Sequence, residues 1–266
     1  MMCHTASDMG NRKFAVGGTS NGHVVKYVRY TGLGAHAGSS PHLGVNALNA
    51  ASFALQAINS TRETHRAEDT VRIHGIMTKG GEAVNAVPSD VRLEWRVRSS
   101  TPKVVVENSR VVDRCFKAGA LAIGAEVQIT TIPGYLPMRH DARLQDLFRA
   151  NAVDVVGEPA TLVMPARRNR GGSTDMGDLS QLMAACHPYT GGAAGPGHSK
   201  EYIINDYETA VITPAKIMAM VVIDLLADGA NQAKAVKATH RPAMTKQAYM
   251  KFQREQAEVV DFNGGG

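Results

Sequence analysis

Residues 91–98 read VRLEWRVR, a run in which apolar and charged side chains alternate without exception. Successive side chains of a β-strand point to opposite faces of its sheet. Every second residue is therefore expected to face a core, namely Val91, Leu93, Trp95 and Val97. The charged residues between them would face solvent. The pattern predicts an antiparallel strand with one buried face.

The segments around this strand follow a regular order. Strand-like patterns cover residues 23–32, 71–78 and 126–132, and apolar residues recur at helical spacing over 45–63 and 101–124. The second helix begins with a threonine and a proline, which are typical of an N-cap and a first helical position. The resulting order is strand, helix, strand, strand, helix, strand. This is the split βαβ pattern of a ferredoxin-like domain, in which two helices cover one face of the sheet.

The pattern ends at PGYLP (133–137), which marks a predicted domain boundary. Beyond it we expect a helix over 142–156, a glycine-rich run with short strands, and a buried helix over 213–229, apolar nearly all round. Residues 1–22 are expected to be irregular, and the tail 231–266 to hold one polar helix. The predicted fold class is α/β (α+β), with a ferredoxin-like domain at residues 23–137.

The composition favours a globular protein and excludes several classes. The chain has 266 residues, of which 44% are hydrophobic and 20% charged, and its formal net charge is +5. No long basic stripe indicates nucleic-acid binding. The dense basic cluster at 166–172 (ARRNRGG) is either a solvated loop or an anion-binding loop. The apolar run 217–227 is shorter than the roughly 20 residues needed to span a bilayer, and we expect no membrane association.

The cysteines and the N-terminus indicate the compartment. Cys3, Cys115 and Cys186 are widely spaced and form no CxxC pair, so a disulfide framework is not expected. The N-terminal residues contain no apolar segment typical of a signal peptide. These features favour a cytoplasmic protein.

One histidine lies in a stretch whose residues are too small and flexible to form part of a core. His36 lies within GLGAHAGSSPHLGVNAL (32–48), flanked by alanine and glycine, and a predicted helix follows at once. It is either an exposed loop residue or a functional group that a ligand can approach. A neutral imidazole can donate a hydrogen bond to a developing oxyanion.

Two further loops carry polar residues among glycines. In GGSTDMGDLSQL (171–182), Ser173 or Asp175 is either the N-cap of a helix or part of a substrate or metal-shell loop. His198 ends a glycine-rich run that is either a mobile loop or one ligand of a metal site. A catalytic zinc needs about three protein ligands, and the chain has no HxxxH, HxH or HxD pair. The residues alone therefore predict no complete catalytic site.

Five motifs together resemble one family, the metal-dependent aminoacylase/carboxypeptidase family of amidohydrolases, and within it the aminobenzoyl-glutamate hydrolase-like branch. The motifs occur in the order and spacing of that family over roughly residues 20–230. They are GLGAHAGSSPHLGVNAL (32–48), GGEAVNAVPSDVRLEWRVR (80–98), PGYLP (133–137), GGSTDMGDLSQL (171–182) and GPGHSKEY (195–202).

The resemblance implies a dizinc catalytic domain with an inserted ferredoxin-like lid through which two copies form a homodimer. Residues 23–137 would be the lid, 1–22 and 138–230 would be pieces of the catalytic domain, and 231–266 would be a tail. The implied substrate is a small N-acyl or aminobenzoyl amino acid, cleaved at its amide bond. In the intact enzyme a bridging metal-bound water would attack the carbonyl.

The resemblance also implies roles for single residues. His36 would polarise the scissile carbonyl in the active site of the partner protomer. Asn85 and Arg98 would help to hold the substrate carboxylate. His198 would be the last metal ligand, and Ser173 and Asp175 would lie on the loop that faces the metals. Thr174 stands where many relatives carry Glu, although the aminobenzoyl-glutamate-like branch also carries Thr there.

One departure concerns the metal ligands. The family's HxD- or HxC-type ligand and its Glu-Glu pair, with the general base, lie well upstream of the lid, and the lid begins here near residue 23. We therefore expect the chain to be a C-terminal portion of such an enzyme, with an incomplete zinc site and no enzyme-like hydrolysis by itself. The alternative is a non-catalytic dimerisation or ligand-binding protein derived from such an enzyme.

Overall fold

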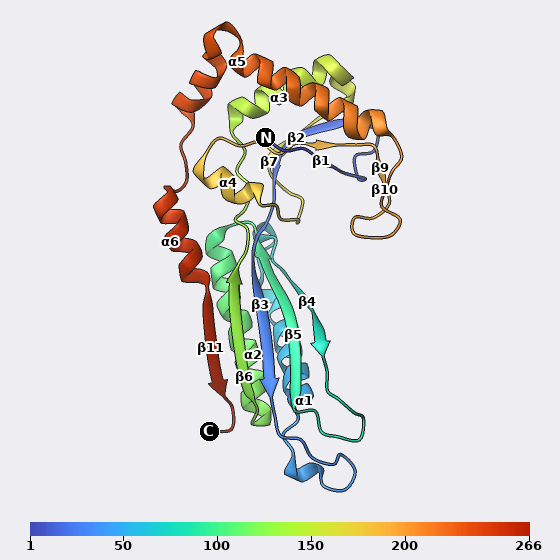
Figure 1. Ribbon diagram of the computed structural model, residues 1–266, viewed down its shortest axis with the longest axis vertical. Helices are drawn as coiled ribbons and strands as arrows, with labels where there is room; N and C mark the ends of the chain where they lie inside the picture. The colour runs from blue at the N-terminus through green and yellow to red at the C-terminus, as the bar shows by residue number, and fades with distance from the viewer. The chain divides into compact units, whose positions relative to one another are not determined.

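The computed structural model describes residues 1–266 and divides into two compact units (Figure 1). Unit 1 consists of Met1–Ser20 and Met138–Lys246. Unit 2 consists of Asn21–Pro137 and Gln247–Gly266. The chain therefore passes between the units three times, and unit 2 contains the segment that the sequence analysis assigns to a ferredoxin-like domain.

Unit 2 is an antiparallel sheet with two helices on one face (Figure 1). Its strands are β3 (Gly22–Thr31), β4 (Arg72–Lys79), β5 (Asp90–Ser99), β6 (Glu126–Pro133) and β11 (Glu258–Asn263), in the order β11-β6-β3-β5-β4. The helices are α1 (Ala47–Ser60) and α2 (Pro102–Ile123). The predicted βαββαβ order is confirmed. Val91, Leu93 and Val97 are buried against the helices, while Trp95 is half-buried near the β4 edge.

The ends of α2 agree with its sequence signals. The Thr101 side chain accepts a hydrogen bond from the backbone N–H of Val104 at 3.3 Å, and Pro102 occupies the first turn. At the other end Gly124 adopts a left-handed conformation with φ of 78°, which closes the helix at low steric cost. The strand β6 begins two residues later.

Small side chains allow α1 and α2 to approach closely. Ala50, Ala51 and Ala54 of α1 are completely buried. A Cβ atom added at Gly119 of α2 would lie 2.3 Å from the Ala50 carbonyl oxygen and 2.9 Å from the Ala54 Cβ. Backbone atoms cannot move aside as the end of a flexible side chain can. Glycine is therefore required where these two helices cross.

Replacing Gly119 with valine is expected to force the two helices apart. Overpacking typically costs about 1–3 kcal/mol, and the clash with backbone places this variant at the upper end of that range or above it. Urea unfolding of the full chain measures the loss. Leu121→Val on the same helix is the control, because Leu121 is 63% exposed and should change stability by no more than about 0.5 kcal/mol. Equal stability of the two variants would contradict the close helix contact.

The C-terminal segment is part of the sheet and not a separate tail. After α6 (Lys246–Gln256), β11 pairs with β6 over six residues, from Glu258 opposite Thr131 to Asn263 opposite Glu126. Gly264 then packs against the end of α2, where an added Cβ would lie 2.2 Å from the Ala120 carbonyl oxygen. The expectation of a tail over 231–266 with only one helix is therefore wrong. Residues 247–266 belong to unit 2.

Unit 1 contains a small sheet covered by helices. Its strand order is β1-β8-β2-β7, with β1 (His4–Thr5), β2 (Phe14–Thr19), β7 (Thr161–Asn169) and β8 (Tyr189–Thr190). The helices are α3 (Ala142–Val156), α4 (Met176–Leu182) and α5 (Thr213–Thr239), and β9 (Ala193–Ala194) pairs with β10 (Ile203–Ile204). Residues 1–22 are thus not irregular, because β2 is an internal strand whose Phe14 packs on Phe148 of α3.

Short helical turns complete both units. They are Pro41–Leu43, Arg62–Thr64, Ala67–Asp69, Glu158–Ala160 and the π-helical turn Glu208–Ile212 that leads into α5.

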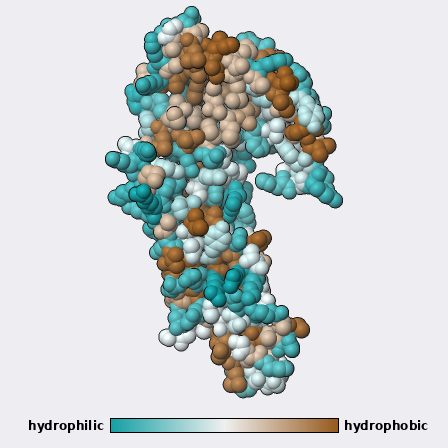
Figure 2. Space-filling view, viewed as in Figure 1, coloured by the Kyte–Doolittle hydropathy of each residue, from teal (hydrophilic) through white to brown (hydrophobic).

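The apolar helix of unit 1 is longer than the run counted in the sequence. Glu208–Thr239 is long and apolar enough, by length and composition alone, to cross a membrane, so the length inferred from residues 217–227 was too short. Its backbone leaves helical geometry at Ala227–Ala230. Ile217 and Val221 are fully buried in the unit 1 core, whereas Val222, Ile223 and Leu226 are exposed. Figure 2 shows apolar residues gathered over this helix.

Candidate functional site

His36 lies in a loop at the end of the unit 2 sheet and has a defined orientation. Its Nδ1 atom accepts hydrogen bonds from the backbone N–H groups of Gly38 and Ser39, both at 3.1 Å. A nitrogen that accepts two hydrogen bonds carries no proton in the neutral ring, so the proton is on Nε2. His36 is only partly buried, and its ring makes no other hydrogen bond. The loop therefore presents an N–H donor to an incoming ligand.

Small residues let this loop dock on a second loop. Leu33 and Val45 form an isolated bridge that closes the His36 loop, and His36 forms another with Ala86. The Ala37 N–H donates to the Asn85 carbonyl oxygen at 2.9 Å, and the Val87 N–H donates to the Ala35 carbonyl oxygen at 2.9 Å. The structure therefore brings two predicted site residues, His36 and Asn85, side by side at one end of the sheet.

Arg98 lies at the other end of the same sheet. It is near the end of β5, whereas Asn85 precedes the start of that strand. Ten strand residues at about 3.4 Å each separate the two ends by roughly 30 Å. Arg98 and Asn85 therefore cannot hold one carboxylate within a single protomer. Burial, followed by the nearby Arg96 charge, lowers the pKa of Arg98.

The predicted residues of unit 1 lie on two loops. Asp175 is the N-cap residue of α4 but makes no capping bond with its own side chain; the Thr174 hydroxyl accepts from the Met176 N–H at 3.3 Å instead. Ser173 lies two residues before the cap. His198 is exposed, between β9 and β10, with a positive φ of 64° that is uncommon for a non-glycine residue.

The structure does not gather a metal-ligand set. No group of three or more His, Cys, Asp or Glu side chains is arranged to hold a metal ion. The residues of this chain therefore do not fit the dizinc centre that the resemblance implies, and His198 has no partner ligands around it.

A cluster of rings in unit 1 was missed by the sequence analysis. His187 contacts Tyr189 with ring centroids 5.0 Å apart and His4 at 6.3 Å, and the Arg170 guanidinium stacks over Tyr189 at 4.4 Å. His187 is 2% exposed, its Nε2 has no partner, and burial lowers its pKa. These residues come from three distant segments. The parallel pairing of β1 with β8 places His4 opposite Tyr189, and Arg170 follows β7, which belongs to the same sheet.

Comparison with known proteins identifies most of the 21–137 segment of unit 2. Residues 17–119 match the peptidase dimerisation domain of the M20 type. The chain contains an M20 peptidase dimerisation domain. His36, Asn85 and Arg98 all lie within it, and Ser173, Asp175 and His198 lie outside it. The family resemblance drawn from the five motifs is confirmed.

Relatives extend the similarity beyond the M20 dimerisation domain. The chain is 30% identical to the mouse Xaa-Arg dipeptidase over 209 residues, which cover 75% of this chain and 47% of that protein. It is 27% identical over 121 residues to a homolog of one p-aminobenzoyl-glutamate hydrolase subunit from Haemophilus influenzae, covering 46% and 28% respectively. The chain thus spans about half the length of the curated dipeptidase relative.

Solved structures share the fold of the chain. The aminobenzoyl-glutamate utilization protein of Klebsiella pneumoniae superposes with a TM-score of 0.62 at 19% identity, covering 85% of this chain and 55% of that one. A hydantoinase/carbamoylase family amidase of Burkholderia vietnamiensis has a TM-score of 0.68 at 19% identity, covering 83% and 53%. The chain is thus related to M20 peptidases and amidohydrolases. These comparisons give no support to a non-catalytic dimerisation or ligand-binding protein.

Proposed function

We propose that this chain provides the lid and part of the catalytic unit of a homodimeric, zinc-dependent amidohydrolase that cleaves the amide bond of N-acyl or aminobenzoyl amino acids. The observation that carries the proposal is the accessible Nε2–H of His36 on a dimerisation domain. Two backbone N–H groups hold its ring in one tautomer. The names of the relatives, a dipeptidase and a homolog of an aminobenzoyl-glutamate hydrolase subunit, support this class of substrate.

The proposed role of His36 is electrostatic. As a nucleophile attacks an amide carbonyl, negative charge develops on the carbonyl oxygen, and a preorganised N–H donor stabilises that charge. The Nδ1 contacts fix the ring before substrate arrives, so the donor needs no reorganisation during the reaction. Asn85, next to His36, adds an exposed side-chain amide that can hold the substrate. Ser173 and Asp175 would belong to the catalytic unit that receives this loop.

We also propose a cytoplasmic location. Cys3, Cys115 and Cys186 are all free. Burial raises the pKa of Cys3 and of Cys186 to about 12, so both thiols remain protonated near neutral pH. Free, protonated thiols, of which Cys115 and Cys186 are buried and Cys3 is partly buried, fit a reducing compartment.

His36→Ala is expected to lower kcat for amide hydrolysis by about 10²–10³, the usual effect of losing one oxyanion donor. The assay uses aminobenzoyl-glutamate and N-acetyl amino acids with zinc supplied. The chain spans about half of its dipeptidase relative. The assay is therefore done once with the chain alone and once with the unmatched half of that relative added in trans. His42→Ala in the same loop is the control and should retain activity.

Two results would contradict the proposal. If neither preparation hydrolysed any of these amides, the amidohydrolase function would be refuted. If the zinc content of His36→Ala fell in parallel with kcat, His36 would act as a ligand and its assignment as a donor would be wrong.

A further inference from the structure

Helix α5 and the turn that leads into it carry an apolar face that the chain leaves exposed. Residues spaced three or four apart lie on one side of a helix. On the buried side, Ile217 and Val221 are completely covered by the unit 1 core. We call the exposed side the apolar stripe, and its members are Ile212, Ala215, Ala219, Val222, Ile223 and Leu226. Its four larger side chains are 40–66% exposed.

No unpaired acidic side chain interrupts the apolar stripe. Lys216 adjoins it and pairs with Glu208 at 3.0 Å. The Asp224 carboxylate accepts a hydrogen bond from the Asn151 amide of α3 at 2.6 Å. A contiguous exposed apolar surface with a polar rim marks an interaction surface. The stripe is therefore a candidate docking face.

Positive charges follow the apolar stripe along the same helix. Beyond the break at Ala227–Ala230, Lys234 and Lys237 lie three residues apart, and Arg241 and Lys246 come next. All four side chains are exposed. The sequence contains no Asp or Glu from residue 229 to residue 254. We call residues 231–246 the basic segment, and its four cations account for most of the formal net charge of +5.

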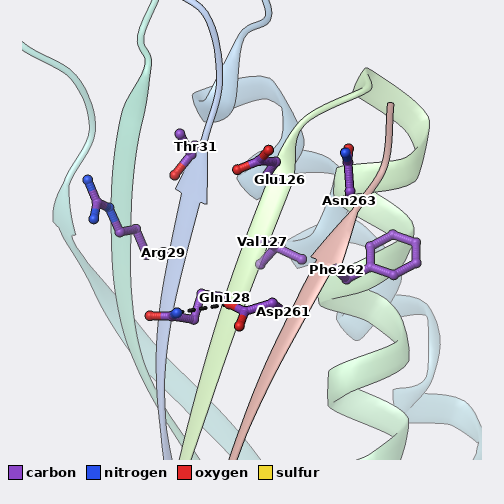
Figure 3. A pocket seen from close by; sticks show the side chains of 8 residues that line it. All are labelled: Arg29, Thr31, Glu126, Val127, Gln128, Asp261, Phe262 and Asn263. Carbon is purple, nitrogen blue, oxygen red and sulfur yellow. Dashed lines mark hydrogen bonds between the residues drawn. The ribbon is translucent and has the colours of Figure 1, made fainter. Parts of the chain in front are cut away.

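The hollow near β11 in unit 2 is a weaker candidate for a binding site. It measures about 410 Å³ (Figure 3). Its polar groups are already paired: the Gln128 amide donates to Asp261 at 2.8 Å, and the Arg29 guanidinium donates to Asp90 at 2.9 Å. These pairs leave little charge for a ligand to neutralise, whereas the cations of the basic segment have no carboxylate partner.

The apolar stripe and the basic segment together fit a partner that is both apolar and anionic. Nucleic acid supplies phosphates, but unpaired bases bind by stacking on aromatic side chains, and residues 208–246 contain no Phe, Trp or Tyr. An anionic phospholipid surface supplies headgroup phosphates for Lys and Arg and acyl chains for apolar residues. Ile217 and Val221 are held in the unit 1 core, so the helix can lie on such a surface but not cross it.

We propose that the apolar stripe and the basic segment of unit 1 bind the surface of an anionic phospholipid membrane. The stripe enters the boundary between headgroups and acyl chains, to a depth of about 5–10 Å, and the basic segment contacts the headgroup phosphates. The expectation of no membrane association was based on residues 217–227 alone, which include neither the start of the stripe nor the cations. This inference goes beyond the proposed function, because membrane binding requires no hydrolysis.

The experiment measures co-sedimentation of the full chain with vesicles of phosphatidylcholine, with and without phosphatidylglycerol. We expect binding only when phosphatidylglycerol is present, and weaker binding at high salt, because salt screens exposed charges. Each Lys or Arg near an anionic surface contributes a factor of about five to binding. The triple variant Lys234→Gln, Lys237→Gln, Arg241→Gln should therefore bind these vesicles about 100-fold more weakly.

Two further variants test the apolar stripe and the helix break. Ile223→Ser with Leu226→Ser should weaken vesicle binding at least about tenfold, because the two apolar side chains no longer leave water. Both residues are exposed, so the variant should remain folded. Asp228→Asn removes the one exposed carboxylate between the stripe and the basic segment and should strengthen binding. Asn tolerates the left-handed backbone of Asp228, whose φ is 48°.

The matched control removes three exposed cations that each have a carboxylate neighbour: Lys103→Gln, Arg149→Gln, Lys200→Gln. Its vesicle binding should be unchanged. An equal loss in the control would show that net charge alone attracts the chain, and it would overturn the proposal. Absence of binding to phosphatidylglycerol vesicles would also overturn it. So would equally tight binding of duplex DNA that does not depend on Ile223 and Leu226, since that would indicate a general polyanion site.

The same measurement separates this inference from the proposed function. The vesicle assay is repeated with the unmatched half of the dipeptidase relative added in trans. If that half restores amide hydrolysis and abolishes vesicle binding, the apolar stripe lies inside the catalytic unit, so the membrane inference is wrong and the hydrolase stands. Vesicle binding without hydrolysis in any preparation would refute the amidohydrolase and leave the membrane surface standing.

Discussion

Asp113→Ala is expected to destabilise unit 2 by about 3–5 kcal/mol, the usual cost of removing one partner of a buried ion pair. Lys26 is 1% exposed, yet its ammonium group lies between the sheet and α2. It donates to the Asp113 carboxylate at 2.8 Å and to the Thr131 hydroxyl at 2.7 Å. Burial lowers the pKa of Lys26, while the Asp113 charge acts in the opposite direction. Without Asp113 the ammonium would remain buried and uncompensated.

Urea unfolding of the full chain, followed by far-ultraviolet circular dichroism, measures this loss. Glu107→Ala on the same helix is the control, because Glu107 is exposed and lies 3.8 Å from Lys103 in a surface pair, for which we expect about 0–1 kcal/mol. The double variant Lys26→Met, Asp113→Leu should recover most of the stability, since an apolar pair can replace a buried ion pair at little cost. If Asp113→Ala lowered the free energy of unfolding no more than Glu107→Ala does, the expectation would be wrong, because water would then reach the Lys26 ammonium group.

The second large effect is a loss of stability in mild acid. His23 in unit 2 and His140 in unit 1 both have a pKa lowered from 6.5 to about 4, chiefly by burial. In each case the unfolded chain binds the proton more tightly than the folded one. The stability contributed is therefore fully present above pH 6.5 and is lost as the pH falls from 6.5 towards 4. A pKa difference of one unit between the folded and unfolded states corresponds to about 1.4 kcal/mol, so each histidine accounts for a loss of roughly 3 kcal/mol in the free energy of unfolding.

Thermal unfolding of the full chain between about pH 7 and pH 4.5 checks this expectation. The melting temperature should fall steeply, and His23→Gln should flatten the pH dependence of unit 2 unfolding. His42→Gln is the control, because His42 is exposed and its replacement should leave the pH profile unchanged. A melting temperature that stays constant over this range, or a steep fall that persists when His23 and His140 are both replaced by glutamine, would contradict the assignment.

Unit 2 was predictable because its signals are local. The alternation of VRLEWRVR places Val91, Leu93 and Val97 on the buried face with no reference to other segments. Thr101, Pro102 and Gly124 mark the limits of α2 through the geometry of their own backbone and side chains. The helix crossing at Gly119 depends on a neighbour, Ala50, which lies in a different helix. Periodicity alone therefore did not predict it.

The errors arose where strand formation depends on a distant partner. Glu258–Asn263 alternates only briefly, with Val260 and Phe262 on one face, and it forms β11 by pairing with β6. Phe14–Thr19 becomes a strand because β7 and β8, which lie far along the chain, pair with it on either side. The pairing of each stretch with a remote segment cannot be read from its own residues.

The features of the candidate site also fall into two groups, those set by local sequence and those set by the tertiary structure. The sequence by itself determined the ferredoxin-like order, the family resemblance and the position of His36 in a loop of small residues, because these depend on local side-chain size, periodicity and motif spacing. Only the tertiary structure decided which nitrogen of His36 carries the proton, through the N–H groups of Gly38 and Ser39. It likewise placed Arg98 and Asn85 at opposite ends of the unit 2 sheet. Charge and hydrogen bonding act through space over a few ångströms, and folding alone brings residues that are distant in sequence within that range.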